Sequence, residues 1–218
     1  MDFAAVFSHL DLYWSGFLRT LLTSAIAVVL SLILGLIVAA LRVSGVKPLA
    51  FFARWYVEFL RNTPLLVQVF FFYYALPQLH LPFLNFNGFQ AGVLGLSFYT
   101  AAYVAEIVRA GIQSIEAGQM EAARASGLTY VQAMVYIIFP QAFRIVIPPL
   151  GTEYINTVKN SAILAFFAGA DLMYVADTLQ GSTGAVFAVY ITAGLFYLLI
   201  TIPLSVFVNF LEKKLLVA

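Results

Sequence analysis

The sequence predicts an all-α integral membrane protein with five transmembrane helices in one domain, residues 1–218. Hydrophobic residues make up 63% of the chain and charged residues only 10%, whereas a soluble domain carries about 25% charged residues. Stretches of about 20 apolar residues cross a bilayer as helices. Such stretches lie at about 17–41, 51–77, 89–113, 142–168 and 187–211.

The distribution of Lys and Arg predicts the orientation of these segments. The connections at about 78–88 and 169–186 contain neither residue. Eight of the eleven basic residues lie in or beside the other connections and after the last segment: Arg42, Lys47, Arg54, Arg109, Arg124, Arg144, Lys213 and Lys214. Because cytoplasmic loops are enriched in Lys and Arg, we expect the amino end outside and the carboxyl end in the cytoplasm.

The connection at about 114–140 is the longest polar stretch, and it lies on the predicted cytoplasmic side. Glu121-Ala122-Ala123 followed by Gly127 predicts a short helix that ends in a turn permitted by glycine. Pro140 is expected to reset the chain before it re-enters the membrane.

Two interpretations of this short helix compete. A helix lying on the bilayer surface usually combines Lys or Arg with Trp, Phe or Leu on its buried side. This one instead presents Ala122, Ala123 and Ala125, which would form a flat surface for the groove of another protein. We therefore predict a docking helix.

Two strings resemble a known family. EAARASGLTYVQAMVYIIFP resembles the cytoplasmic EAA loop of permease subunits of bacterial ATP-binding-cassette (ABC) importers, with Phe139 in place of the usual leucine. RNTPLLVQVFFFYY, from Arg61 to Tyr74, is similar to the R-G-T-P-L-L-V-Q segment of polar amino acid permeases, with Asn62 where glycine is commoner. The resemblance extends over most of the chain.

The resemblance implies a multi-pass subunit of the bacterial plasma (inner) membrane. Its implied partners are a second permease subunit (a homodimer or heterodimer), two cytoplasmic ATP-binding subunits, an external substrate-binding protein and an amino acid. ATP and Mg would act on the ATPase, and this chain would bind no cofactor. The sequence agrees, because it contains no G-x-x-x-x-G-K-[ST] phosphate loop. We expect no enzyme activity, no metal site and no nucleic-acid partner.

The first candidate part of a substrate path is the stretch around Pro64. Proline removes a helix hydrogen bond, and broken backbone at membrane depth is tolerated only against protein or a wet cavity. The freed backbone groups could bind the carboxylate or ammonium group of an amino acid. The alternative is a simple kink whose freed carbonyl is met by Thr63. The candidate residues here are Glu58, Asn62, Thr63, Leu65, Leu66 and Gln68.

The second candidate part is a polar stripe in segment four. Glu153, Asn156, Thr157 and Asn160 have helical spacing on one face, and Lys159 lies at its edge. Four polar groups facing lipid would be costly, so this face should be wet or packed against a partner. The alternative is that Glu153 and Lys159 join helices, within the chain or across a permease dimer.

Three other acidic residues receive weaker expectations. Glu106 and Arg109 are three residues apart and can pair locally, so we expect a structural or gating role for them. Asp171 and Asp177 lie in an outer connection, where we expect a solvated face.

The leading hypothesis is a permease for a polar amino acid. Glu58 and Glu153 favour a cationic one such as arginine, lysine or histidine. Arg61 and Lys159 could offset that preference, so glutamine and acidic amino acids remain alternatives. A secondary carrier that works without an ATPase would leave the docking helix unexplained, and no internal repeat is visible. An intramembrane enzyme lacks support, because the sequence shows no paired aspartates in its spans and no Ser/His pairing.

Overall fold

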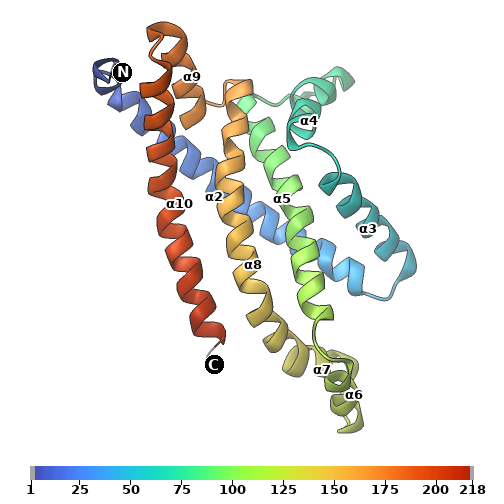
Figure 1. Cartoon of the computed structure of the whole chain (residues 1–218). Helices are drawn as coiled ribbons and strands as arrows, with labels where there is room; N and C mark the ends of the chain where they lie inside the picture. Colours follow the sequence, from blue (N-terminus) through green and yellow to red (C-terminus); the bar gives the residue numbers. More distant parts are fainter. Residues whose placement is uncertain (1–2, 217–218) are drawn as a thin grey trace.

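The computed structural model describes residues 3–216, and every regular element in this range is a helix. Large apolar side chains such as Phe52 and Phe187 are exposed on the bundle surface, which is expected where lipid, not water, is the solvent. Four long helices form the bundle in Figure 1: α2 (Leu10–Val43), α5 (Gly88–Gln113), α8 (Phe139–Asn160) and α10 (Val186–Leu216).

Shorter elements connect the long helices. The α-helices among them are α1 (Ala4–Phe7), α3 (Lys47–Arg61), α4 (Leu65–Phe70), α6 (Ala117–Ala125), α7 (Tyr130–Ala133) and α9 (Leu172–Thr183). Two are π-helical, η1 (Phe71–Ala75) and η4 (Met134–Ile138), and three are 3₁₀ helices, η2 (Leu76–Leu79), η3 (Pro82–Leu84) and η5 (Ser161–Phe167).

Four helical runs in the described residues are long and apolar enough to cross a membrane: Leu10–Val43, Gly88–Gln113, Tyr130–Phe167 and Val186–Leu215. The all-helical membrane class is therefore confirmed. The predicted segment at about 51–77 is not one unbroken helix, because α3 ends at Arg61 and a separate apolar run follows over Leu65–Leu79.

Helix α5 is the central and most buried of the long helices, and it packs against α2, α3, α4 and α8. A capping box starts it, in which Asn87 and Gln90 exchange side-chain and backbone hydrogen bonds of 2.9 and 3.0 Å. The crossing with α2 is close because Gly35 has no side chain. A Cβ at Gly35 would lie 2.5 Å from a Val104 methyl carbon, so small residues here let the two helices approach.

Different elements of the chain lie at the two ends of the bundle. Figure 1 shows α6, α7 and the carboxyl end at one end, and the amino end, α4 and α9 at the other. Arg124 in the last turn of α6 and Lys213 and Lys214 in the last turn of α10 therefore belong to elements that end on the same side of the bundle. Which end faces the cytoplasm stays a prediction.

The expectation that Asp171 lies on a solvated face is wrong, because Asp171 is fully buried. Its carboxylate caps the start of α9 by accepting hydrogen bonds from the backbone amides of Met173 and Tyr174 (3.2 Å each). Burial raises the pKa of its carboxyl to about 6, against the lowering effect of those hydrogen bonds. The adjacent Leu172 amide donates to Thr20 on α2 at 3.0 Å, so this connection is anchored to the bundle.

Candidate functional site

The short helix predicted in the connection at about 114–140 exists as α6 (Ala117–Ala125), and local hydrogen bonds form its end. Gly127 has φ +86°, a conformation that side-chain-bearing residues rarely adopt. This bend lets the Gly127 amide donate to the Arg124 carbonyl (3.1 Å) and the Leu128 amide to the Ala123 carbonyl (3.2 Å). The pair of bonds is a Schellman motif, which stops a helix after its last turn. The sequence prediction for Gly127 agrees with this geometry.

The exposed face of α6 is narrower than the alanine pattern suggested. Glu121, Ala122 and Ala125 are exposed, whereas Ala123 is only 7% exposed. Helix α6 packs against α7 and η4, and Ala123 lies on that inner side. The expectation that all three alanines form the docking surface is wrong for Ala123, because a helix only nine residues long still needs one face to hold it to the protein.

Pro140 also has a different role from the predicted one. It lies in the first turn of α8, directly after η4, and the helical run continues from Tyr130 to Phe167. Proline fits there because its missing amide falls where the π-helical turn has already altered the hydrogen-bond pattern. Pro140 therefore does not end the polar connection. The connection ends at Thr129, whose side chain caps α7 with Gln132.

Around Pro64, side chains replace the lost helix hydrogen bonds. Asn62 Nδ2 donates to the Glu58 carbonyl (2.7 Å), and Thr63 Oγ1 donates to the Phe59 carbonyl (2.5 Å). Gln68 is only 5% exposed, and its side-chain Nε2 donates to the carbonyls of Leu60 (2.8 Å) and Thr63 (3.1 Å). The carbonyls of Glu58, Phe59, Leu60 and Thr63 are therefore satisfied internally, as the kink interpretation expects, and they are not free for a ligand.

The amino end of α4 retains unused polar groups. The backbone amides of Leu65 and Leu66 have no hydrogen-bond acceptor among the described residues, and the Oε1 atom of Gln68 is buried without a donor. Buried polar atoms are nearly always paired in proteins. The side chains of Leu65 and Leu66 pack on a cluster that includes Val69 and Phe167. Their backbone amides are therefore the groups of these two residues that could bind a ligand.

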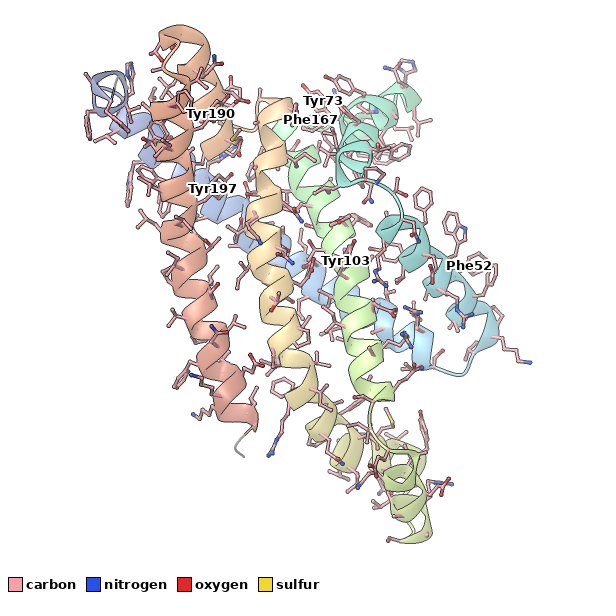
Figure 2. All side chains as sticks on the ribbon, in the orientation of Figure 1. Phe52, Tyr73, Tyr103, Phe167, Tyr190 and Tyr197 are labelled. Carbon is pink, nitrogen blue, oxygen red and sulfur yellow. The ribbon has the colours of Figure 1, made fainter. Side chains whose placement is uncertain are left out.

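Aromatic rings pack around the run that follows Pro64. Phe167, at the end of η5, packs edge-on against Phe70 and Tyr73, with ring centroids 5.0 and 5.4 Å apart. Figure 2 shows Tyr73 and Phe167 close together at this end of the bundle, well away from Tyr103 at mid-height. The break at Pro64 thus lies between an aromatic layer and the charged residues of α5.

The polar stripe on α8 is partly buried. Glu153 is 9% exposed and Thr157 is fully buried, whereas Asn156 and Asn160 are half-buried. The Thr157 hydroxyl lies 3.1 Å from the Thr100 hydroxyl of α5. Lys159 is exposed. The stripe is therefore buried at Glu153 and Thr157 and exposed at Lys159.

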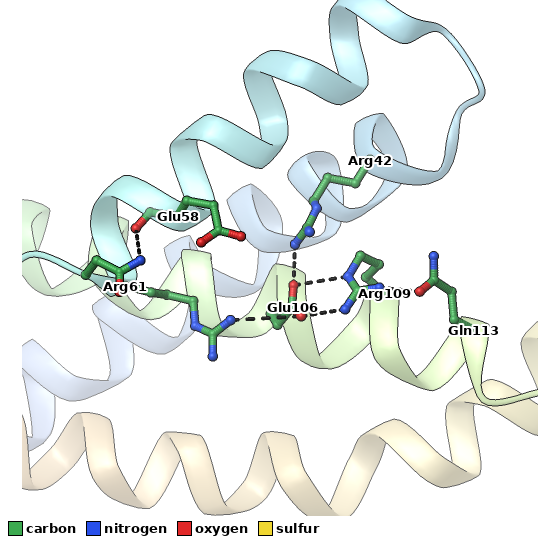
Figure 3. A network of polar contacts seen from close by, with 7 residues as sticks. Arg42, Glu58, Arg61, Glu106, Arg109 and Gln113 are labelled. Atoms are coloured by element: carbon green, nitrogen blue, oxygen red, sulfur yellow. Dashed lines mark hydrogen bonds and ion pairs between the residues drawn. The ribbon is translucent and has the colours of Figure 1, made fainter.

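Glu106 is the centre of an ion network that the sequence revealed only in part. Arg109 donates from Nε (3.1 Å) and Nη2 (2.5 Å) to its carboxylate, in agreement with the predicted local pair. Arg42 of α2 also donates to it, and Nη1 of Arg61 lies 3.9 Å away. Figure 3 shows these three arginines converging from three helices. The partners from α2 and α3 are distant in sequence, so spacing could not reveal them.

A pair of tyrosines on α5 lies beside this network. The Arg61 guanidinium carbon lies 5.1 Å from the centre of the Tyr103 ring, which is cation–π distance. The Tyr103 hydroxyl lies 3.1 Å from the Tyr99 hydroxyl. Glu58, by contrast, is exposed and has no ion-pair partner among the described residues.

A large apolar cavity of about 650 Å³ lies elsewhere, beside η4. Amino acids carry an ammonium and a carboxylate group, which require polar partners when water is removed. Apart from Ser44 and Tyr130, its lining side chains are apolar, so it does not suit such a ligand. The lining includes Leu36, Val108, Met134, Phe139, Val146 and Leu150. In residues 3–216, no three His, Cys, Asp or Glu residues are grouped to hold a metal ion.

The sequence of this chain is similar to a family of transport proteins and to several of its members. Residues 31–217 match the family described as "Binding-protein-dependent transport system inner membrane component". The chain is 54% identical over 215 residues to the "Probable glutamine ABC transporter permease protein GlnM" of Bacillus subtilis, which covers 99% of this chain and 98% of that protein. It is 35% identical over 215 residues to the "Arginine transport system permease protein ArtQ" of the same organism. That match covers 99% of this chain and 97% of that protein.

A solved structure is similar over nearly the whole chain. The crystal structure of an amino acid ABC transporter with histidines contains a chain that is 39% identical and superimposes with a TM-score of 0.92. The match covers 98% of this chain and 99% of that chain.

Proposed function

The chain belongs to the family of binding-protein-dependent transport system inner membrane components and is a permease subunit of an amino acid ABC transporter; from this premise we propose that it imports glutamine. It is a transport subunit of the inner membrane, not an enzyme. Cationic amino acids are the second candidate substrates.

The observation that supports coupling to an ATPase is the geometry of α6. This helix projects from the end of the bundle that also holds the carboxyl end (Figure 1), and its exposed face carries Glu121, Ala122 and Ala125. Small side chains on a projecting helix suit insertion into a groove of another protein. We assign this role to α6, with Gly127 fixing where the helix stops.

Five crossings remain our proposal for the membrane arrangement. Helix α3 and the run Leu65–Leu79 would together form the second crossing, joined at the break before Pro64. The internal hydrogen bonds of Asn62, Thr63 and Gln68 satisfy the carbonyls at that break, which is the condition for placing non-helical backbone at membrane depth. The end with α6 would face the cytoplasm, because Lys and Arg gather there.

The substrate path would run between the start of α4 and the polar face of α8. The amides of Leu65 and Leu66 suit the carboxylate of an amino acid, since helix amino ends favour negative charge. The unpaired Oε1 of Gln68 suits the ammonium group once a side chain moves to admit it. Glu153, Asn156, Lys159 and Asn160 would contact the substrate side chain.

Glutamine is favoured by the similarity in sequence. The relative that is 54% identical is described as a probable glutamine permease. The arginine permease among the relatives and the histidine transporter among the solved structures favour the second candidate.

The proposed partners are a second permease subunit, two cytoplasmic ATPase subunits that bind ATP and Mg, and an external binding protein. The second permease subunit is either another copy of this chain or a related chain. Co-expression of tagged and untagged copies of this chain, followed by pull-down, distinguishes a homodimer from a heterodimer.

Reconstituted transport tests the function. Proteoliposomes would contain the complex of this chain with its ATPase, and uptake of labelled glutamine, arginine and glutamate would be measured with and without internal ATP. We expect ATP-dependent uptake of glutamine above the other two. Uptake by this chain without an ATPase would refute the coupling, and uptake of arginine alone would refute the assigned substrate.

A further inference from the structure

Helix α3 has three faces of different character, and the first of them holds it to the bundle. Val57 on this face is buried and packs in a cluster with Ala105 of α5. The Tyr56 hydroxyl donates to the Phe98 carbonyl, also of α5, at 2.8 Å. Helix α3 therefore lies beside a helix that is long and apolar enough to cross a membrane.

The second face of α3 carries charge along the whole helix. Four charged residues are separated by seven, four and three positions, the spacing that places side chains on one side of a helix; they are Lys47, Arg54, Glu58 and Arg61. We call these residues the charged stripe. All four are exposed, and the first three make no ion pair among the described residues. Figure 3 shows Glu58 and Arg61 extending from the same side of α3.

The third face of α3 is aromatic and is also exposed. Its four large side chains are between 51% and 67% exposed: Phe51, Phe52, Trp55 and Phe59. The rings of Trp55 and Phe59 stack, with their centroids 5.3 Å apart. Acyl chains are as apolar as these rings, and tryptophan is enriched where a membrane protein meets lipid. The aromatic face therefore suits contact with lipid, and the charged stripe lies to one side of it.

Lipid does not suit the charged stripe. Charged side chains at membrane depth almost always face the interior of an assembly or a water-filled cavity. Long Lys and Arg side chains can reach the headgroups from a position near the membrane surface, but the glutamate side chain is shorter. Glu58 also lies about three turns into α3 and one turn before the break at Pro64. Reaching for headgroups therefore does not account for Glu58.

We propose, on the basis of the proposed function, that the charged stripe lines a water-filled passage, which carries the amino acid from the break at Pro64 toward the end of the bundle that holds α6. Figure 1 shows α3 leading from α4 in that direction. The stripe offers both signs of charge, so a zwitterionic amino acid keeps partners for its ammonium and carboxylate groups as it moves. Ion pairs exposed to water are weak, so each contact releases the amino acid to the next.

Cysteine labelling tests what surrounds each face of α3, because the chain contains no cysteine of its own. Arg54→Cys and Glu58→Cys place a thiol on the charged stripe, and Phe52→Cys on the aromatic face is the matched control, since all three positions are exposed on one helix. Vesicles containing the complex with its ATPase, with the α6 end toward the added reagent, would be treated with a charged, membrane-impermeant methanethiosulfonate. The two stripe cysteines should react at least about tenfold faster than the control, because the reagent attacks thiolate and a thiol in lipid stays protonated.

Two labelling results would overturn the passage. Reaction of Arg54→Cys without reaction of Glu58→Cys would mean that the stripe reaches only the headgroups, and reaction of both at the rate of Phe52→Cys would mean that the stripe is covered. If Glu58→Cys does not assemble, transport decides: a bulky reagent attached to Arg54→Cys should stop ATP-dependent glutamine uptake, and uptake that continues after complete labelling overturns the passage. Labelling does not require transport. A complex that labels as expected but imports no amino acid therefore refutes the proposed function and not the water-filled passage.

Discussion

Replacing Gly127 by alanine isolates the backbone contribution to coupling. A Cβ at this position meets nothing within 4 Å, so the substitution causes no steric contact with the rest of the protein. The only change is the cost of holding φ at +86° with a side chain, which amounts to roughly 1–2 kcal/mol. That energy falls entirely on the Schellman turn that ends α6.

The expected consequence is a loosened end of α6. A cost of about 1.4 kcal/mol corresponds to a tenfold change in an equilibrium constant, so the open form of the turn becomes about ten times more populated. Amide hydrogen exchange should accelerate at Gly127 and Leu128, whose amides make the two capping bonds. In proteoliposomes, the amount of amino acid imported per ATP hydrolysed should fall, because the docking helix no longer transmits movement as a fixed body.

Gly118 supplies the matched control. It lies in α6, and a Cβ there also meets nothing within 4 Å, but its φ is not positive. Gly118→Ala should therefore stabilise the helix by roughly 0.5–1 kcal/mol and leave coupling intact. The reasoning fails if Gly127→Ala retains normal exchange and a normal transport-to-hydrolysis ratio, or if both alanine variants uncouple equally.

Three other predictions follow from packing and burial. Gln68→Ala removes the amide that caps two carbonyls at the break, which should destabilise the protein by about 1–3 kcal/mol; an unchanged melting temperature in detergent would contradict this capping role. Gly35→Ala places a Cβ 2.5 Å from Val104 and should cost about 1–3 kcal/mol in the same assay, whereas Gly194→Ala, in open space, should not. Asp171 has a folded pKa of about 6 against an ordinary value of 3.8, so its folded state binds protons more tightly. Stability should then be highest below pH 4 and fall, by about 3 kcal/mol from this group, as pH rises through 6. Asp171→Asn should remove that part of the pH dependence, and an identical pH profile in the variant would show that burial of Asp171 is not its source.

Much of the fold could be predicted from local sequence. Apolar runs predicted five crossing segments, and four of them correspond to helices long and apolar enough to cross a membrane, because the cost of burying charge in lipid acts on each run separately. The break before Pro64 could also be foreseen, since proline lacks the amide that a helix requires. What local sequence did not show is that Gln68 reaches back to cap that break, which depends on the angle between α3 and α4.

The candidate site was predicted less completely. The polar face of α8 followed from helical periodicity, and in the structure Glu153 and Thr157 on this face are buried. The inner position of Ala123 and the burial of Asp171 did not follow, because burial depends on which neighbour covers a residue. Nothing in the spacing distinguishes a covered alanine or aspartate from an exposed one.

The sequence by itself determined the membrane class, the short helix α6 with its turn at Gly127, and the break in the second segment. Each of these depends on interactions within a few residues along the chain, such as a glycine turn, a missing amide or the hydropathy of one helix. The tertiary structure alone decided that Glu106 pairs with Arg42, 64 positions away, and that Arg61 of α3 lies over the Tyr103 ring of α5. Charge pairing falls off with distance in space, and spatial distance between helices is set by packing, which no local pattern records.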